Sequence, residues 1–121
     1  MATRRDWTVT STHELRVADG EDVTFVGRPD GRPVHGVLPL EEHGAAIILI
    51  DPNAPGDSNV FRVLPDGRIE WRAELPDDSP RSDRYSSISR KDDRLLGFTG
   101  YGYWVELDPE TGAVLSSEWH K

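Results

Sequence analysis

Cysteine is absent from the 121 residues of the chain, which excludes disulfides, thiolate catalysis and zinc sites built on cysteine. Positive charge is scarce as well, because 14 Lys and Arg residues stand against 22 Asp and Glu residues and give a net charge of −8. Nucleic acids and anionic membranes both attract proteins through Lys and Arg side chains. The composition therefore predicts neither a nucleic-acid partner nor a membrane partner. It is compatible with a basic protein partner, with DNA mimicry or with plain solubility.

Long hydrophobic runs are missing. The longest apolar run is AAIILI at 45–50, far below the roughly 20 residues that span a bilayer. The stretch MATRRDWTVT at 1–10 carries two arginines but no apolar segment behind them, so it does not resemble a secretory signal. Arginine outnumbers lysine, as is typical of proteins from GC-rich bacterial genomes. We therefore expect a bacterial protein of the cytoplasm.

No segment has the pattern of a long amphipathic helix. Gly and Pro recur every few residues and apolar residues mostly alternate, which indicates strands. The predicted strands are Trp7–Thr10, Glu14–Val17, Val23–Val26, Val34–Leu38, Ala45–Ile50, Asn59–Val63, Ile69–Leu75, Tyr85–Arg90, Arg94–Phe98, Tyr103–Leu107 and Val114–Trp119. The fold class is all-β and antiparallel, with residues 1–121 in a single domain.

One predicted strand differs from the others. Ala45–Ile50 does not alternate, so we expect both of its faces to be covered and the strand to be central in the core. Polar stretches at 51–58 and 75–87 are predicted to be loops. Whether the first 20 residues pair into a sheet is left open.

Three turns have similar sequences: RPDGRPV at 28–34, LPDGRIE at 64–70 and LDPETGAV at 107–114. In each, Pro and an acidic residue precede a glycine that we expect to close a hairpin in the left-handed conformation. These glycines, at positions 31, 67 and 112, are 36 and 45 residues apart. About 40 residues is the period of a four-stranded propeller blade, so the spacing predicts blade-like hairpins.

The second turn lies in SNVFRVLPDGRIEWRAEL, which resembles a blade hairpin of β-propellers of the pyrroloquinoline-quinone (PQQ) type. The resemblance rests on Phe61, Asp66, Gly67 and Trp71. GYWVELDPETGAVL resembles the same hairpin but has Ser116 at the tryptophan position. The residues that carry this second resemblance are Gly102, Leu107, Asp108, Thr111, Gly112 and Leu115.

The C-terminal half is also similar to small uncharacterised bacterial all-β proteins without assigned chemistry. Both resemblances imply a fold and no cofactor. A closed propeller needs at least four blades, whereas this chain has material for two or three. We therefore expect a small barrel, two packed sheets or a partial propeller that could associate through its open sheet edges.

No catalytic, cofactor or metal site is predicted. In DPNAPGDSNVFR, Asp51, Asn53 and Gly56 match a calcium loop at positions 1, 3 and 6, but Pro55 and Arg62 stand where oxygen ligands are needed. The histidines are not paired at metal-ligand spacing, and no nucleophile or phosphate-binding motif occurs. The sequence therefore favours a binding protein over an enzyme.

The candidate partner-binding residues form two groups. Asp77, Asp78 and Asp83 lie in the polar loop before Tyr85 and could present an acidic face, the alternative being a solvated loop. FTGYGYW at 98–104 is the densest aromatic cluster, and its aromatic residues either fill the core or remain exposed as binding anchors. The candidates in this second group are Tyr101, Tyr103 and Trp104.

Two functions remain open. The first is an acidic protein-interaction module of the inhibitor or immunity type, which would bind a basic protein. The second is a small-molecule-binding β-barrel, including an enzyme of specialised metabolism that works without a recognisable motif. The first requires a filled core with an exposed acidic or aromatic face. The second requires a cavity lined by Tyr, Trp and Ile with polar groups inside.

Overall fold

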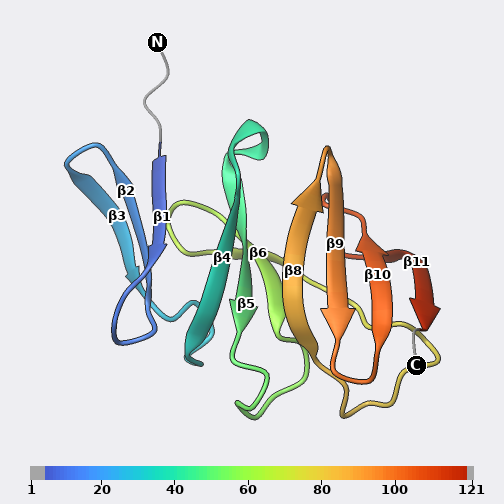
Figure 1. The fold of residues 1–121 in the computed structure, drawn as a ribbon. Coiled ribbons are helices and arrows are strands. Elements are labelled where there is room, and N and C mark those ends of the chain that lie inside the picture. Colours follow the sequence, from blue (N-terminus) through green and yellow to red (C-terminus); the bar gives the residue numbers. More distant parts are fainter. Residues whose placement is uncertain (1–4, 120–121) are drawn as a thin grey trace.

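The computed structural model describes residues 5–119, which form three antiparallel sheets (Figure 1). Sheet 1 contains β1 (Arg5–Val9), β2 (Leu15–Asp19) and β3 (Asp22–Gly27). Sheet 2 contains β4 (Val34–Leu40), β5 (Ala45–Ile50), β6 (Val60–Val63) and β7 (Ile69–Arg72), with the short 3-10 helix η1 (Glu41–His43) between β4 and β5. Sheet 3 contains β8 (Tyr85–Lys91), β9 (Arg94–Thr99), β10 (Tyr103–Leu107) and β11 (Val114–Trp119).

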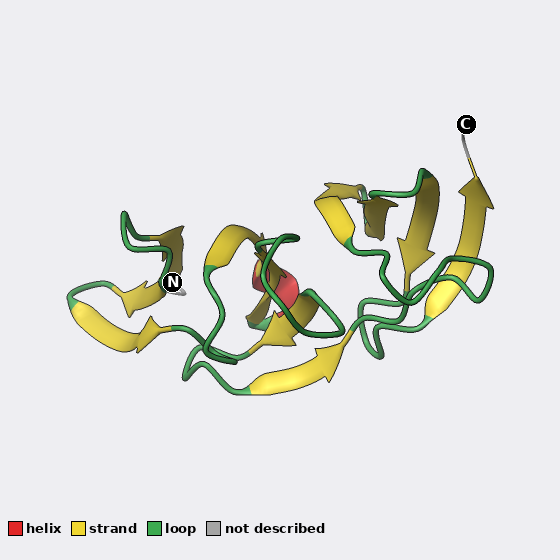
Figure 2. Cartoon of the chain, turned by 90° about the horizontal axis from the view of Figure 1, so that it is seen from below, coloured by secondary structure: helices red, strands yellow, loops and turns green. Residues whose placement is uncertain are grey.

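Within each sheet, strands that follow one another in the sequence are hydrogen-bonded neighbours. The chain then passes from the last strand of one sheet to the first strand of the next, and the three sheets stand in a row (Figure 2). Every predicted strand corresponds to an observed one, and the first 20 residues do pair into a sheet. The all-β prediction with blade-like hairpins is confirmed. Among the forms left open, the structure has the partial propeller.

The core consists of two apolar clusters, one on each face of sheet 2. The cluster against sheet 1 includes Trp7, Ile48 and Phe61, and the cluster against sheet 3 includes Ile47 and Leu107. Successive side chains of a strand point to opposite faces, so β5 contributes to both clusters and all six of its residues are buried. The prediction of a central strand covered on both faces is confirmed.

The predicted turn glycines all have positive φ, at 87° for Gly31, 86° for Gly67 and 76° for Gly112. Gly67 and Gly112 close the β6–β7 and β10–β11 hairpins, as predicted. The expectation of a hairpin at Gly31 is wrong, because this turn lies in the connection from β3 to β4, which belong to different sheets. A left-handed glycine specifies a local bend, and it leaves open whether the flanking strands pair with each other.

A buried asparagine joins sheet 2 to sheet 3. Asn59, only 2% exposed, donates through its Nδ2 to the carbonyl oxygens of Ile50 (3.1 Å) and Tyr85 (2.7 Å). Its Oδ1 accepts the backbone N–H of Tyr85 at 2.9 Å. The side chain therefore satisfies both backbone groups of the first residue of β8, which fixes where sheet 3 begins relative to sheet 2.

No helix among residues 5–119 is long and apolar enough to cross a membrane.

Candidate functional site

The candidate site is built on residues 73–84, the segment that links β7 of sheet 2 to β8 of sheet 3. We call it the linking segment. Its apolar residues turn inward: Ala73 and Pro76 are buried, and Leu75 packs against the core cluster between sheets 2 and 3. Glu74 and Asp77 alternate with these residues and are exposed. The alternation of apolar and acidic residues therefore directs carboxylates to solvent.

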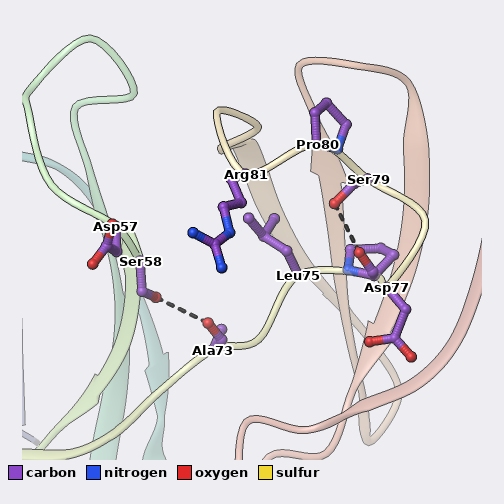
Figure 3. A pocket seen from close by; sticks show the side chains of 9 residues that line it. Asp57, Ser58, Ala73, Leu75, Asp77, Ser79, Pro80 and Arg81 are labelled. Atoms are coloured by element: carbon purple, nitrogen blue, oxygen red, sulfur yellow. Dashed lines mark hydrogen bonds between the residues drawn. The ribbon is translucent and has the colours of Figure 1, made fainter.

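Two hollows flank the linking segment. The first, of about 570 Å³, lies between the segment and the loop that contains Asp57 and Ser58 (Figure 3). In that view the Arg81 guanidinium points into the hollow, and Asp57 and Asp77 lie at opposite ends of it. The second hollow, of about 500 Å³, lies on the side of β11 and is lined by Glu74, Asp77 and Asp78 with residues 114–117. Four carboxylates and one guanidinium thus surround this part of the surface.

The carboxylates of this surface belong to the acids that have no ion-pair partner in the part of the chain that the structure describes. Hydrogen-bonded ion pairs neutralise other acids, as in Asp30 with Arg32 (2.6 Å) and Glu70 with Arg62 (2.7 Å). Within residues 5–119, the four carboxylates around the linking segment form no ion pair; they belong to Asp57, Glu74, Asp77 and Asp78. Their charge is therefore available to a ligand.

Two of the predicted aromatic residues support the linking segment. The hydroxyl of Tyr103 donates to the carbonyl oxygen of Asp78 at 3.2 Å, and the hydroxyl of Tyr101 lies 3.2 Å from the hydroxyl of Ser82. Tyr101 is 54% exposed, and its carbonyl oxygen accepts the indole N–H of Trp119 at 2.9 Å. The structure thus brings Asp77, Asp78, Tyr101 and Tyr103 together, with Trp119 beside them.

The expectation that Asp83 presents an exposed acid is wrong. Its side chain is 1% exposed, and Oδ1 accepts the backbone N–H groups of Arg84 (2.9 Å) and Tyr101 (3.1 Å). Asp83 Oδ2 is buried and has no hydrogen-bond partner among the described residues. Asp83 therefore connects the start of β8 to the β9–β10 turn and is not part of an accessible surface.

Tyr85 is likewise a core residue and cannot contact a partner. It is 1% exposed, and its ring occupies space that Gly97 leaves, since a Cβ at Gly97 would lie 2.7 Å from the ring. Its hydroxyl donates to the carbonyl oxygen of Glu74 at 2.7 Å. Burial raises the pKa of this hydroxyl above its ordinary value, and the charges of Asp83 and Glu74 raise it further.

Trp104 lies away from the linking segment. It is on the face of sheet 3 opposite to Val105 and Leu107, which are buried against sheet 2. It is 49% exposed, and its ring centroid is 4.7 Å from that of Phe98. Tyr103 lies on the same face as Val105 and Leu107, opposite to Trp104, so the aromatic cluster does not form one binding surface.

Sequence reasoning missed Asp57, Glu74 and Arg81. Asp57 is 20 or more residues away in sequence from Asp77 and Asp78, and only the packing of sheet 2 on sheet 3 brings its loop beside the linking segment. Glu74 fell inside a predicted strand that ends earlier, at Arg72. The alternation of Glu74 and Asp77 with Leu75 and Pro76 was the sequence signal that could have indicated that Glu74 is exposed.

The chain belongs to a family of domains of unknown function, DUF7957, whose model matches residues 9–119. No curated protein matches the chain significantly.

Solved β-propeller structures share the fold. The computationally designed Ika8 protein aligns with a TM-score of 0.60 and 12% identity, over 94% of this chain and 32% of that chain. BamB from Moraxella catarrhalis, a propeller of the PQQ type, aligns with a TM-score of 0.60 and 15% identity, over 96% of this chain and 35% of BamB. BBS1N, in complex with ARL6DN, gives a TM-score of 0.58 and 12% identity, over 97% and 35%. The chain thus spans about a third of each of these propellers.

Proposed function

We propose that this domain is a protein-interaction module of the inhibitor or immunity type, which binds a basic partner through the linking segment. The observation that carries the proposal is the group of carboxylates without ion pairs around two adjacent hollows. Asp57, Glu74, Asp77 and Asp78 attract a cationic surface, and the second hollow, which three of these carboxylates line, accepts a Lys or Arg side chain from it. Tyr101 adds an exposed aromatic anchor beside them.

The packing of the core also supports a binding module. The faces between the sheets are filled by apolar side chains, and the hollows around the linking segment are open to solvent and lined by loop residues. A filled core together with an exposed acidic surface is what a protein-interaction module requires. Among the structures that share the fold, BBS1N is itself described in a complex, with ARL6DN.

The experiment is a tagged pull-down from the source organism at low and at high salt, read by mass spectrometry. We expect one abundant basic partner that is lost at high salt, because ions screen the interaction of exposed charges. The affinity of that partner is then measured for the double variant Asp77→Asn, Asp78→Asn. The loss of two exposed charges at about 0.7 kcal/mol each gives a roughly tenfold weaker complex.

The matched control is Glu21→Gln with Asp22→Asn, which removes the same net charge at the exposed β2–β3 turn of sheet 1. This control variant should retain the affinity of the unmodified chain. Equal weakening by both double variants would show that only net charge matters, and the proposed surface would be wrong.

A second candidate function is the binding of a small molecule, and the size of the first hollow favours it. Its volume of about 570 Å³ falls within the ~300–1,000 Å³ of ligand sites. Leu75 and Pro80 give it apolar walls, and Arg81 points into it as a cation for an anionic group. Thermal-shift screening with small carboxylates and phosphates tests this function, and Arg81→Gln should abolish any stabilisation that such a ligand produces.

A further inference from the structure

The last strand of sheet 3, β11, has an open edge. It pairs with β10 on one side, and no strand of residues 5–119 pairs with it on the other (Figure 1). The last strands of sheets 1 and 2 each contact the turn of the following sheet. Thr24 of β3 donates to the carbonyl oxygen of Pro65 at 2.6 Å, and the indole of Trp71 in β7 donates to that of Pro109. No later sheet follows β11 within the described residues, so its edge is accessible.

The start of β11 shows how its backbone is oriented. The N–H of Asp108 donates to the carbonyl oxygen of Ala113 at 2.9 Å, so these two residues form a hydrogen-bonded pair between β10 and β11. Successive residues of an antiparallel pair alternate in this respect, and the next residue, Val114, therefore turns its backbone groups away from β10. Its N–H donates instead to Oε1 of Glu74 in the linking segment, at 3.4 Å. The open edge of β11 thus faces the acidic surface.

Two residues further along β11 also direct their backbone groups to the open edge. Because Asp108 bonds to β11, every second residue before it on β10 does the same, and the residues in between bond to β9. Tyr103 and Val105 are among the residues in between, and they lie opposite Trp119 and Ser117. The N–H and C=O groups of Ser117 and Trp119 are therefore free to bond to a further strand. The strand also contains no Lys or Pro, which edge strands commonly use against pairing.

The second hollow lies beside this edge. Residues 114–117 form one wall, and Glu74, Asp77 and Asp78 lie on the other. The side chain of Ser117 is on the same face of sheet 3 as that of Val105, which is buried toward sheet 2. A strand added to the edge would place every second side chain on this face, next to three carboxylates that form no ion pair within residues 5–119.

We propose that the partner adds an extended basic segment to β11 as a fifth strand of sheet 3. This inference rests on the proposed function and specifies the form in which the partner binds. The segment runs antiparallel to β11, and its backbone bonds to Ser117 and Trp119. Lys or Arg side chains at alternate positions extend into the second hollow toward Asp77 and Asp78. The strand edge binds any extended backbone, and the carboxylates select a basic one.

The register makes a specific prediction about such a segment. Residues directly opposite each other in an antiparallel pair have their side chains on the same face. The residues opposite Ser117 and Trp119 therefore carry the basic side chains, and the same residues donate their backbone N–H groups to β11. The apolar or neutral residues between them direct their N–H groups away from the protein.

The probe is the blocked peptide acetyl-KVKVK-amide, titrated into the isotope-labelled full chain and followed by NMR. Binding should shift the amide resonances of Ser117 and Trp119 and slow their hydrogen exchange, because both amides gain a partner. High salt should weaken the binding. The double variant Asp77→Asn, Asp78→Asn should bind the peptide roughly tenfold more weakly, as expected for two exposed charges.

Two isomers of the peptide with equal charge separate strand pairing from simple attraction. N-methylation of two lysines removes N–H groups directed at β11, and the loss of two hydrogen bonds should weaken binding roughly tenfold or more. N-methylation of the two valines changes only the outer edge of the added strand. This second isomer should bind as tightly as the unmethylated peptide.

Ser117→Pro tests the same contact from the side of the protein. Proline removes the N–H directed to the open edge, leaves the bonds to β10 in place and is tolerated in edge strands. The variant should bind the unmethylated peptide roughly tenfold more weakly. Ser117→Ala is the matched control, because it retains the N–H and should keep the full affinity. Circular dichroism confirms that both variants are folded.

The outcomes distinguish this inference from the proposed function. Equal binding of the two methylated isomers would overturn strand addition and leave the acidic surface in place as a binding site. The absence of binding by all three peptides would also overturn the inference, while the pull-down tests the proposed function separately. Full affinity in the double variant Asp77→Asn, Asp78→Asn would overturn the selection of a basic segment by these carboxylates.

Discussion

The indole ring of Trp71 in sheet 2 lies against the backbone of Gly112 in the hairpin turn of sheet 3. A Cβ at Gly112 would be 2.5 Å from Cε3 of Trp71, and the indole N–H donates to the carbonyl oxygen of Pro109 at 3.0 Å. The same relationship occurs one sheet earlier, where Phe25 of sheet 1 lies against Gly67 in the turn of sheet 2. An aromatic side chain from the last strand of each of these two sheets therefore packs on the turn of the next.

Gly112→Ala tests this contact. A left-handed φ costs a non-glycine residue about 1–2 kcal/mol, and the clash with Trp71 adds about 1–3 kcal/mol. We expect a loss of about 3 kcal/mol in the free energy of unfolding, measured by urea denaturation.

Gly20→Ala is the control for Gly112→Ala, because Gly20 has φ of 63° but no atom within 4 Å of its would-be Cβ. It should cost only about 1–2 kcal/mol, the conformational part alone. If the two variants lose the same stability, the contact of Trp71 with the turn contributes nothing.

Asn59→Ala should destabilise the junction of sheets 2 and 3. The substitution leaves the backbone N–H and C=O of Tyr85 without the partners they have, in a buried place where each unsatisfied group costs about 1–3 kcal/mol. We expect a loss of at least 3 kcal/mol and faster hydrogen exchange at the Tyr85 amide. The exposed Asn53→Ala serves as the control and should change stability by less than about 0.5 kcal/mol.

Tyr85 should make the protein sensitive to alkaline pH. Its pKa is raised in the folded state by burial, so folding favours the neutral phenol. The resulting stability is fully present below the unfolded pKa of about 10 and is lost as pH rises above it, by up to about 1.4 kcal/mol per pH unit.

Tyr85→Phe removes the titrating group and isolates its effect. The variant lacks the hydrogen bond to Glu74, so it should be less stable at pH 8, but it should lose less stability than the unmodified chain between pH 8 and pH 11. Urea denaturation of both chains at these two pH values gives the comparison. Parallel loss in the two chains would mean that Tyr85 does not titrate differently on folding.

Arg62→Lys should weaken the contact of sheet 2 with the β10–β11 turn. The guanidinium of Arg62 donates through Nε to Glu70 (2.7 Å) and through a terminal nitrogen to the carbonyl oxygen of Pro109 (2.6 Å). One ammonium group does not reproduce this fork, and we expect a loss of about 1–2 kcal/mol in unfolding free energy. Arg68→Lys, on an exposed pair with Asp66, is the comparison and should leave stability nearly unchanged.

Local patterns predicted the strands of this fold well, and they predicted less of how the strands combine. AAIILI at 45–50 showed a strand buried on both faces, because only such a strand is apolar throughout. The turn at Gly31 gave no sign that its flanking strands belong to different sheets, since partner choice depends on contacts outside the turn. The number of sheets depends on which strands pair with each other. The sequence therefore did not distinguish a small barrel, two packed sheets and a partial propeller.

The candidate site was predicted in part. Asp77 and Asp78 are exposed, as expected of acids in a Pro- and Ser-rich loop. Asp83 has the same local composition but is buried, because its partner is the backbone N–H of Tyr101, 18 residues away. Asp57 joins the site through packing of separate sheets. Contacts between residues this far apart in the sequence give no local pattern. For this reason Asp83 was expected to be exposed, and Asp57 was not predicted to belong to the site.

The covered middle sheet has a consequence for how the molecule unfolds. Each outer sheet shares its core cluster with sheet 2 alone. The three sheets therefore form a linear array, in which each sheet is stabilised by its own contacts and by its interface with the neighbouring sheet. Sheet 1 can open while sheets 2 and 3 stay together, and the linking segment at their junction keeps its shape when it does. Amides of β1 to β3 should then exchange before those of β5 and β6. Evolution can alter the N-terminal sheet without disturbing the acidic surface.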